Sequence, residues 1–367
     1  MSLVAACGPF TDFTDAAFCP FVLAIFYTGI TTGTTPTTYD PTASVTRLQM
    51  AAFLSRTVDA SVKKASLRVS QRQNWTTRDA AAFGLTTLAA APQFVESDGE
   101  DIWVSHTGGT VTRVHASDGR VLGTWTGASS GQGVLSAMGR VFVAGMSNPG
   151  RLYQIDPGAA PSAVTTVASS LGQASRGIAF DGQRIWTANN GQGNTGGSVS
   201  IITPGASIPW SVTTVTAGFT VPEGILYDGA NIWVTDTNAG TLLKLSSSGA
   251  VLQTVTVQAT PRHPVYDGVN IWVPASNGRI SVVRATTGAV LSTTSDGSLG
   301  SGFQAAFDGQ RVLVTHDDGS TISVWKAMDL SEIGVVDPGQ GSNPLGVASN
   351  GLSFYFALSG PGQLARF

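Results

Sequence analysis

One short pattern recurs seven times along this chain: a two-residue turn ending in glycine, followed by a triplet of apolar residues. In the clearest copies the turn is Asp-Gly and the triplet contains Trp, as in Asp181-Gly182 before Ile185-Trp186 and Asp228-Gly229 before Ile232-Trp233. The turns begin at residues 98, 138, 181, 228, 267, 308 and 350, at intervals of 39 to 47 residues. A period of about 42 residues is typical of the four-stranded blade of a β-propeller. The pattern therefore predicts a mainly β protein with a seven-bladed propeller.

Each copy can be divided into the same four strands. A short apolar strand, such as residues 224–227, precedes the Asp-Gly hairpin, and the Trp strand follows it. A third strand, a second glycine turn and an outer strand complete the unit, as in residues 110–114, Asp118-Gly119 and 121–125. We interpret the recurrent Trp as packing between blades, with an aromatic ligand platform as the alternative.

The last copy has room for only two strands after Asn350-Gly351, because the sequence ends at Phe367. Residues 83–89 resemble the outer strand at residues 212–216. We expect them to complete the seventh blade and close the ring, which removes exposed sheet edges. The propeller then spans residues 83–367.

Composition agrees with a β fold and excludes several classes of protein. Only 12% of the residues are charged, and 44 are glycine, which does not suit a disordered chain or a helical bundle. The net charge of −3 gives no basic face for nucleic acid. The longest apolar run, residues 18–27, is too short to span a membrane. We expect a monomer.

The two cysteines, Cys7 and Cys19, lie close together near the N-terminus. A local pair of this kind suits a disulfide in an exported protein, and two unrelated free thiols are the alternative. No signal peptide is visible, because no basic segment precedes an apolar one. We expect a protein of the bacterial cell surface or extracellular space.

Residues 1–59 have a different pattern from the propeller. Residues 18–27 and 46–59 show helical spacing of apolar side chains, and Thr46 is placed to cap the second helix. The motifs Phe13-x-Asp15, Gly29-Ile30-Thr31-x-Gly33, Tyr39-Asp40-Pro41 and Val45-Thr46-Arg47-x-Gln49 follow in order.

These motifs resemble a surface-layer homology (SLH) repeat over roughly residues 10–57. Such repeats bind cell-wall polysaccharide, usually as three copies, and the resemblance implies that Arg47 contacts the glycan. Only one repeat is present, so a unit that simply packs on the propeller is the alternative. Residues 60–82 form the one basic stretch, which we interpret as a helix continuation and linker, or as a contact for an anionic glycan.

The propeller resembles the streptogramin-lyase-like and NHL-like seven-bladed families in its repeat pattern. Propellers usually bind ligands at one mouth of the central channel, on loops that enter the first strand and leave the second. Aligning the copies at these positions gives a set of polar residues: Arg176, Asn189, Glu223, Asp236, Arg262, His263 and His316. We predict that they form a pocket for a polar or anionic small molecule or a glycan, because Arg suits carboxylate and phosphate. The alternative is a wet channel mouth in which they pair with one another.

The predicted function is a non-enzymatic binding or scaffold module attached to the cell surface. The alternative is a metal-assisted lyase or hydrolase at the propeller mouth. Streptogramin lyases use His and Glu with magnesium at this face, and the nearest matches here are His263 and His316 with Glu223 and Asp236. No catalytic residue and no cofactor is assigned, although a divalent cation is possible.

Overall fold

The computed structural model describes residues 7, 9–12, 15, 17–27, 30–57, 83–193, 195–294 and 299–367. The chain divides into two compact units, Met1–Trp75 and Thr76–Phe367. The proposed linker at residues 60–82 lies outside the described residues.

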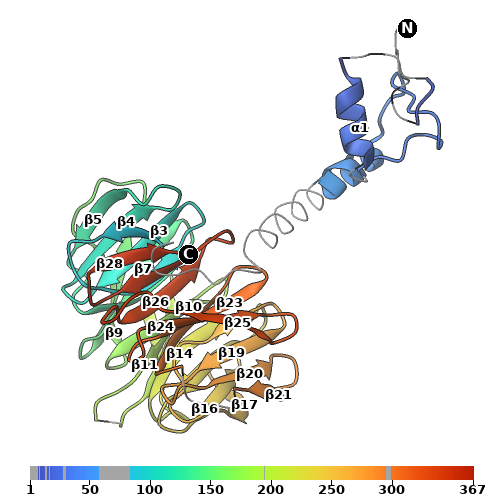
Figure 1. Ribbon diagram of the computed structural model, residues 1–367. Helices are drawn as coiled ribbons and strands as arrows, with labels where there is room; N and C mark the ends of the chain where they lie inside the picture. The colour runs from blue at the N-terminus through green and yellow to red at the C-terminus, as the bar shows by residue number, and fades with distance from the viewer. Residues whose placement is uncertain are drawn as a thin grey trace. The chain divides into compact units, whose positions relative to one another are not determined.

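The second unit is a seven-bladed β-propeller of seven four-stranded antiparallel sheets (Figure 1). Blade 1 consists of β2 (Pro92–Ser97), β3 (Asp101–His106), β4 (Thr110–His115) and β5 (Val121–Thr126). Blade 2 consists of β6 (Gly131–Ala137), β7 (Arg140–Gly145), β8 (Gly150–Ile155) and β9 (Thr165–Leu171). Blade 3 consists of β10 (Ser175–Phe180), β11 (Ile185–Asn189), β12 (Ser198–Thr203) and β13 (Ser211–Val215).

The later blades repeat this order. Blade 4 consists of β14 (Pro222–Tyr227), β15 (Ile232–Asp236), β16 (Thr241–Leu245) and β17 (Val251–Thr256). Blade 5 consists of β18 (Val265–Tyr266), β19 (Asn270–Pro274), β20 (Ile280–Arg284) and β21 (Val290–Thr293). Blade 6 consists of β22 (Gly302–Phe307), β23 (Arg311–His316), β24 (Thr321–Lys326) and β25 (Glu332–Val336). Blade 7 consists of β26 (Pro344–Ser349), β27 (Phe354–Leu358), β28 (Gln363–Arg366) and β1 (Gly84–Thr87).

Strand β1 is the outermost strand of blade 7, although it precedes every other strand in the sequence. It pairs antiparallel with β28, and Leu85 lies opposite Ala365. Phe83, just before β1, packs edge-on against Phe356 of the same blade with ring centroids 5.5 Å apart. The two ends of the propeller sequence thus share one sheet, which closes the ring.

The repeated Asp and Trp residues are joined by a hydrogen bond within each hairpin. In blades 1, 3, 4 and 5 the Trp indole Nε1 donates to the turn Asp Oδ2 at 2.7–2.8 Å. The four indoles are buried between blades, Trp103, Trp186 and Trp233 being 0% exposed. In blade 6 Leu313 replaces the Trp, and Arg311 Nε donates to Asp308 Oδ2 instead. The recurrent Trp therefore packs between blades, as the sequence indicated.

The first strands of the seven blades surround the central channel, each in contact with the first strands of the neighbouring blades. Four of these contacts require glycine, at Gly133, Gly177, Gly224 and Gly346, because the backbones approach very closely. A Cβ at Gly224 would lie 2.6 Å from the Arg262 carbonyl oxygen, and one at Gly177 would lie 2.6 Å from the Glu223 carbonyl oxygen. This close approach brings residues of blades 3, 4 and 5 together at the channel.

The first unit contains helix α1 (Cys19–Tyr27) and a second helical segment at residues 47–57. Cys7 and Cys19 form a disulfide, as predicted. Asp15 Oδ1 accepts the Ala17 amide at 2.8 Å ahead of α1. Thr46 and Gln49 form a reciprocal capping box, because Thr46 Oγ1 accepts the Gln49 amide and Gln49 Oε1 accepts the Thr46 amide.

No helix among the described residues is long and apolar enough to cross a membrane.

Candidate functional site

Four of the seven predicted pocket residues meet around one buried carboxylate. Arg176 in β10 and Arg262 just before β18 each place Nη1 3.1 Å from Oε1 of Glu223 in β14. His263 Nε2 lies 3.5 Å from the same oxygen, and Asn190 Nδ2 donates to Glu223 Oε2 at 2.6 Å. We call these five residues the Glu223 cluster.

Hydrogen bonds to blades 4 and 6 hold the backbone of Arg262 and His263, which precede the first strand of blade 5. Thr235 Oγ1 in β15 donates to the Arg262 carbonyl at 2.7 Å and accepts the Gly224 amide at 2.9 Å. The His263 amide donates to the Phe303 carbonyl at 3.1 Å. These bonds tie the segment that contains Arg262 to the neighbouring blades on both sides. The position of the Arg262 guanidinium therefore depends on blades 4, 5 and 6.

Glu223 is ionised and His263 is neutral near neutral pH. Burial by itself would raise the pKa of Glu223, but the hydrogen bond with His263 and the charges of Arg176 and Arg262 hold that pKa far below its usual range. Burial lowers the pKa of His263, and Arg262 and Arg176 lower it further, against the opposing effect of Glu223. The Glu223 cluster therefore holds two cationic side chains and one anionic side chain.

The guanidinium groups in this cluster keep hydrogen-bonding capacity. Both bond to the same oxygen of Glu223, and neither forms the two parallel bonds of a bidentate pair. Among the described residues, Nε of Arg176 and Nε of Arg262 are buried and have no hydrogen-bond partner. The two side chains are 32% and 21% exposed, so each also reaches solvent.

Three rings lie beside the Glu223 cluster, contributed by blades 1, 5 and 6. Phe94 in β2, His263 and Phe303 in β22 pack against one another with centroids 4.9–5.5 Å apart. The Arg262 guanidinium lies over the Phe303 ring, 5.6 Å from its centroid. The rings support one side of the cluster and restrict the orientation of His263.

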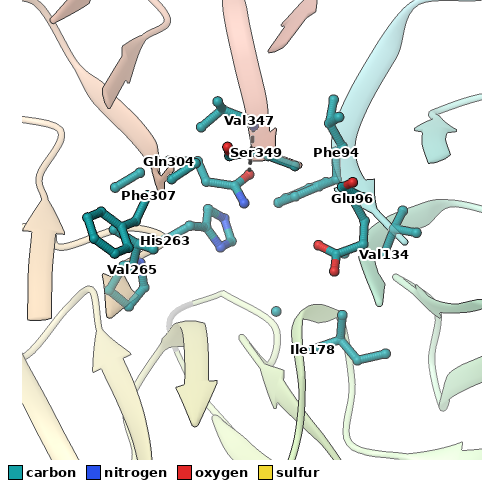
Figure 2. A pocket seen from close by; sticks show the side chains of 18 of the residues that line it. Phe94, Glu96, Val134, Ile178, His263, Val265, Gln304, Phe307, Val347 and Ser349 are labelled. Atoms are coloured by element: carbon teal, nitrogen blue, oxygen red, sulfur yellow. Dashed lines mark hydrogen bonds between the residues drawn. The ribbon is translucent and has the colours of Figure 1, made fainter. Parts of the chain in front are cut away.

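Beyond these rings, the channel contains a cavity of about 260 Å³ (Figure 2). It is lined by the middle and later residues of the first strands, whereas Arg176 and Glu223 lie earlier on their strands. His263 and Phe94 take part in both regions. Figure 2 shows the Glu96 carboxylate, the His263 ring and the Gln304 amide directed into the cavity.

The structure does not bring the other three predicted residues to the Glu223 cluster. The Asn189 side chain bonds to Ser175, Thr187, Ser198 and Ser200 in its own sheet. Asp236 accepts the backbone amides of Thr220, Val221 and Ala239. His316 bonds to Ser323 Oγ at 2.9 Å and to the Gly300 carbonyl at 3.2 Å. All three are 0% exposed, and their bonds stabilise their own blades.

The sequence prediction missed Asn190 and Glu96. Asn190 directly follows Asn189, so the repeat alignment selected the neighbour that faces into the sheet. Glu96 lies two residues before the Asp98-Gly99 turn. The equivalent residues are uncharged in every other blade: Ser136, Ala179, Leu226, Val265, Ala306 and Ala348. Its departure from the repeat was the available signal.

The Glu223 cluster does not fit a divalent cation. Oε1 of Glu223 is shared by two guanidinium groups, and Oε2 accepts from Asn190, so both oxygens already have donors. The carboxylate oxygens of Asp236 are occupied by backbone amides. Among the described residues, no group of three His, Cys, Asp or Glu side chains is placed to share a metal ion.

Arg47 is the first residue of the helical segment 47–57, directly after the capping Thr46, and it is exposed. Its contact with a glycan stays a prediction.

Seven blades around a channel, with polar residues at one level of the first strands, define this unit as a seven-bladed β-propeller. Similar solved structures include a streptogramin B lyase, with a TM-score of 0.63 and 15% identity over 79% of this chain and 99% of that one. A catalytically inactive virginiamycin B lyase from Staphylococcus aureus with quinupristin has a TM-score of 0.63 and 13% identity, covering 77% of this chain and 98% of that one. The WD40 β-propeller domain of Doa1 has a TM-score of 0.61 and 15% identity, covering 77% and 96%.

At these identities the likeness concerns the fold alone. No protein-family model and no curated protein sequence matches the chain.

Proposed function

We propose that this protein is an exported binding module whose propeller binds an anionic small molecule or the acidic group of a glycan at the Glu223 cluster. The observation that carries the proposal is that Arg176 and Arg262 share one oxygen of Glu223. One carboxylate cannot neutralise two guanidinium groups, and the two arginine side chains remain 32% and 21% exposed. An added carboxylate or phosphate would balance the charge and accept hydrogen bonds from the exposed part of each guanidinium.

The proposed position at the cell surface is supported by the Cys7–Cys19 disulfide, since such bonds persist in oxidising compartments. The resemblance of residues 10–57 to an SLH repeat supports attachment to wall polysaccharide through Arg47. The capping box formed by Thr46 and Gln49 begins the helix at Arg47 and leaves this side chain exposed. Sedimentation of the protein with purified cell walls tests this part, and Arg47→Ala should reduce the bound fraction.

The ligand proposal is tested with two sugars that differ only at C6. Glucuronate carries a carboxylate there, and glucose carries an uncharged hydroxymethyl group. Isothermal titration should show binding of glucuronate and much weaker binding of glucose. Arg262→Ala should weaken glucuronate binding by about 1–3 kcal/mol, the usual loss for a charged hydrogen bond. Arg151→Ala, at an exposed position on β8, is the matched control and should bind normally.

Equal binding of both sugars, or an unchanged affinity in Arg262→Ala, would contradict an anion site at this cluster. Glu223→Gln adds a second test, because it removes the internal anion that competes for both guanidinium groups. It should strengthen glucuronate binding while lowering thermal stability.

A further inference from the structure

The cavity in the central channel has a composition unlike that of the Glu223 cluster. Val134, Ile178, Ile225, Val265 and Val347 contribute aliphatic side chains to its wall, and Phe94 and Phe307 contribute rings. Ser97, Gln304 and Ser349 contribute uncharged polar side chains. No Lys or Arg is among the lining residues. Glu96 contributes a carboxyl group and His263 an imidazole that is neutral near neutral pH.

Glu96 lines this cavity and is the charged exception at a repeat position that is uncharged in the other blades. Val265, Ala306 and Ala348 occupy the same repeat position and also line the cavity with apolar groups. An apolar residue at position 96 would match these neighbours. A carboxylate withdrawn from water is costly unless a cation pairs with it, and no Lys or Arg lines the cavity, so packing alone does not account for Glu96.

We propose that this cavity is a binding site for a small organic cation, of the class of a primary alkylammonium ion, with its charge against Glu96. The ammonium group would donate hydrogen bonds to the Glu96 carboxylate, and the alkyl chain would contact the aliphatic wall. The Phe94 and Phe307 rings can add attraction for the cation. A cavity of about 260 Å³ has room for a ligand of a few non-hydrogen atoms, smaller than a drug-sized molecule.

Binding of a cation must displace a proton from Glu96. Burial, aided by the charge of Asp98 in the same hairpin and opposed by the backbone amide of Ser136, raises the pKa of Glu96 to about 8. The other ionisable group facing the cavity is His263, from the segment before β18. The lining residues from β6, β10, β14, β22 and β26 contribute no ionisable group. At pH 7 the bound ammonium therefore replaces a proton as the partner of the carboxylate.

Calorimetry of the full-length protein with n-butylammonium chloride tests the proposal. Titrations in two buffers of different ionisation enthalpy should show release of close to one proton per ligand at pH 6.5. The affinity should rise nearly tenfold between pH 6 and 7 and level off above pH 8. 1-Butanol, which has the same chain without the charge, should bind far more weakly and release no proton.

Glu96→Gln should abolish both the binding and the proton release. This change keeps the side-chain shape and removes a buried acid, so the variant should fold. Glu100→Gln, at an exposed position in the same hairpin, is the matched control and should bind as the original protein does. Unchanged binding in Glu96→Gln, equal binding of butanol, or binding of Mg²⁺ or Ca²⁺ but not of the ammonium ion would each overturn the proposal.

The test is distinct from that of the proposed anion site, because it measures binding of a cation and release of a proton at Glu96, whereas the anion site is tested with glucuronate and Arg262→Ala.

Discussion

The indole Nε1 of Trp233 donates a 2.7 Å hydrogen bond to Oδ2 of Asp228, five residues earlier in the same hairpin. Oδ1 of this carboxylate accepts the backbone amides of Ala230 and Asn231. One side chain thus closes the turn and fixes the orientation of the largest side chain in the blade. The same arrangement in three further blades explains why Asp and Trp recur together in the sequence.

Asp228→Ala should destabilise the propeller by about 2–4 kcal/mol, because a buried indole N–H and two turn amides lose their acceptor. Asp228→Asn should cost less. Asn350 already accepts two turn amides in blade 7, and only the bond to the indole would be lost. Urea unfolding followed by Trp fluorescence measures both variants. A smaller loss for Ala than for Asn would contradict this role of the carboxylate.

Closure of the ring depends on Phe83, whose ring packs against Phe356 and Phe367 at 5.5 and 5.7 Å. Phe83→Ala should lower the free energy of unfolding by about 3–5 kcal/mol, as is typical of a buried Phe. Leu85→Ala, two residues later in β1, is a matched control because Leu85 is 52% exposed. It should change the stability by less than about 1 kcal/mol. Similar losses in the two variants would show that the closing strand is not held by Phe83.

His316 should make the propeller sensitive to acid. Burial lowers its pKa from 6.5 to about 4, so the unfolded chain takes up a proton at a higher pH than the folded protein. The contribution of neutral His316 to stability is therefore complete above pH 6.5 and is lost as the pH falls toward 4. The loss is a few kcal/mol at most, since one pKa unit corresponds to about 1.4 kcal/mol.

His316→Asn tests this pH dependence, because Asn189 occupies the equivalent position in blade 3 and bonds to Ser200 there. Thermal unfolding between pH 4 and 7.5 should show a shallower decrease in Tm for the variant. An unchanged slope would mean that His316 does not bind a proton on unfolding in this range.

The disulfide should stabilise the first unit alone. Its small core contains Cys7, Phe10 and Val22, and a bond between residues 12 apart contributes about 3 kcal/mol by restricting the unfolded chain. Dithiothreitol should speed proteolysis within residues 7–57 and leave the propeller resistant, because residues 83–367 contain no cysteine. Equal cleavage of the two units after reduction would contradict the prediction.

The fold could be predicted from the sequence because it repeats. Each hairpin is a local unit, and in four blades a hydrogen bond joins the turn Asp to a Trp five residues later. Because the turn pattern occurs seven times, the hairpins can be recognised from the sequence alone. The strand that closes the ring was recognisable because blade 7 lacks its outer strand after Phe367, while residues 83–89 resemble one.

The candidate site could be predicted only in part. Repeat positions placed Arg176, Glu223 and Arg262 at one level of the channel, and there they meet. The same reasoning grouped Asn189, Asp236 and His316 with them, because each ends the second strand of its blade. The sequence does not distinguish the directions in which side chains at such equivalent positions point. Whether such a side chain faces the channel or its own sheet depends on contacts between residues far apart in the chain.

The sequence by itself determined the number of blades, the turns and the candidate polar residues, since these follow from local periodicity. The tertiary structure alone decided that two arginines from different blades share one glutamate oxygen, and that Glu96 faces a cavity in the channel that no Lys or Arg lines. Both relationships arise from the ring, which brings the first strands of separate repeats within contact distance. The sequence pattern within one repeat carries no information about which side chains of other repeats its residues will contact.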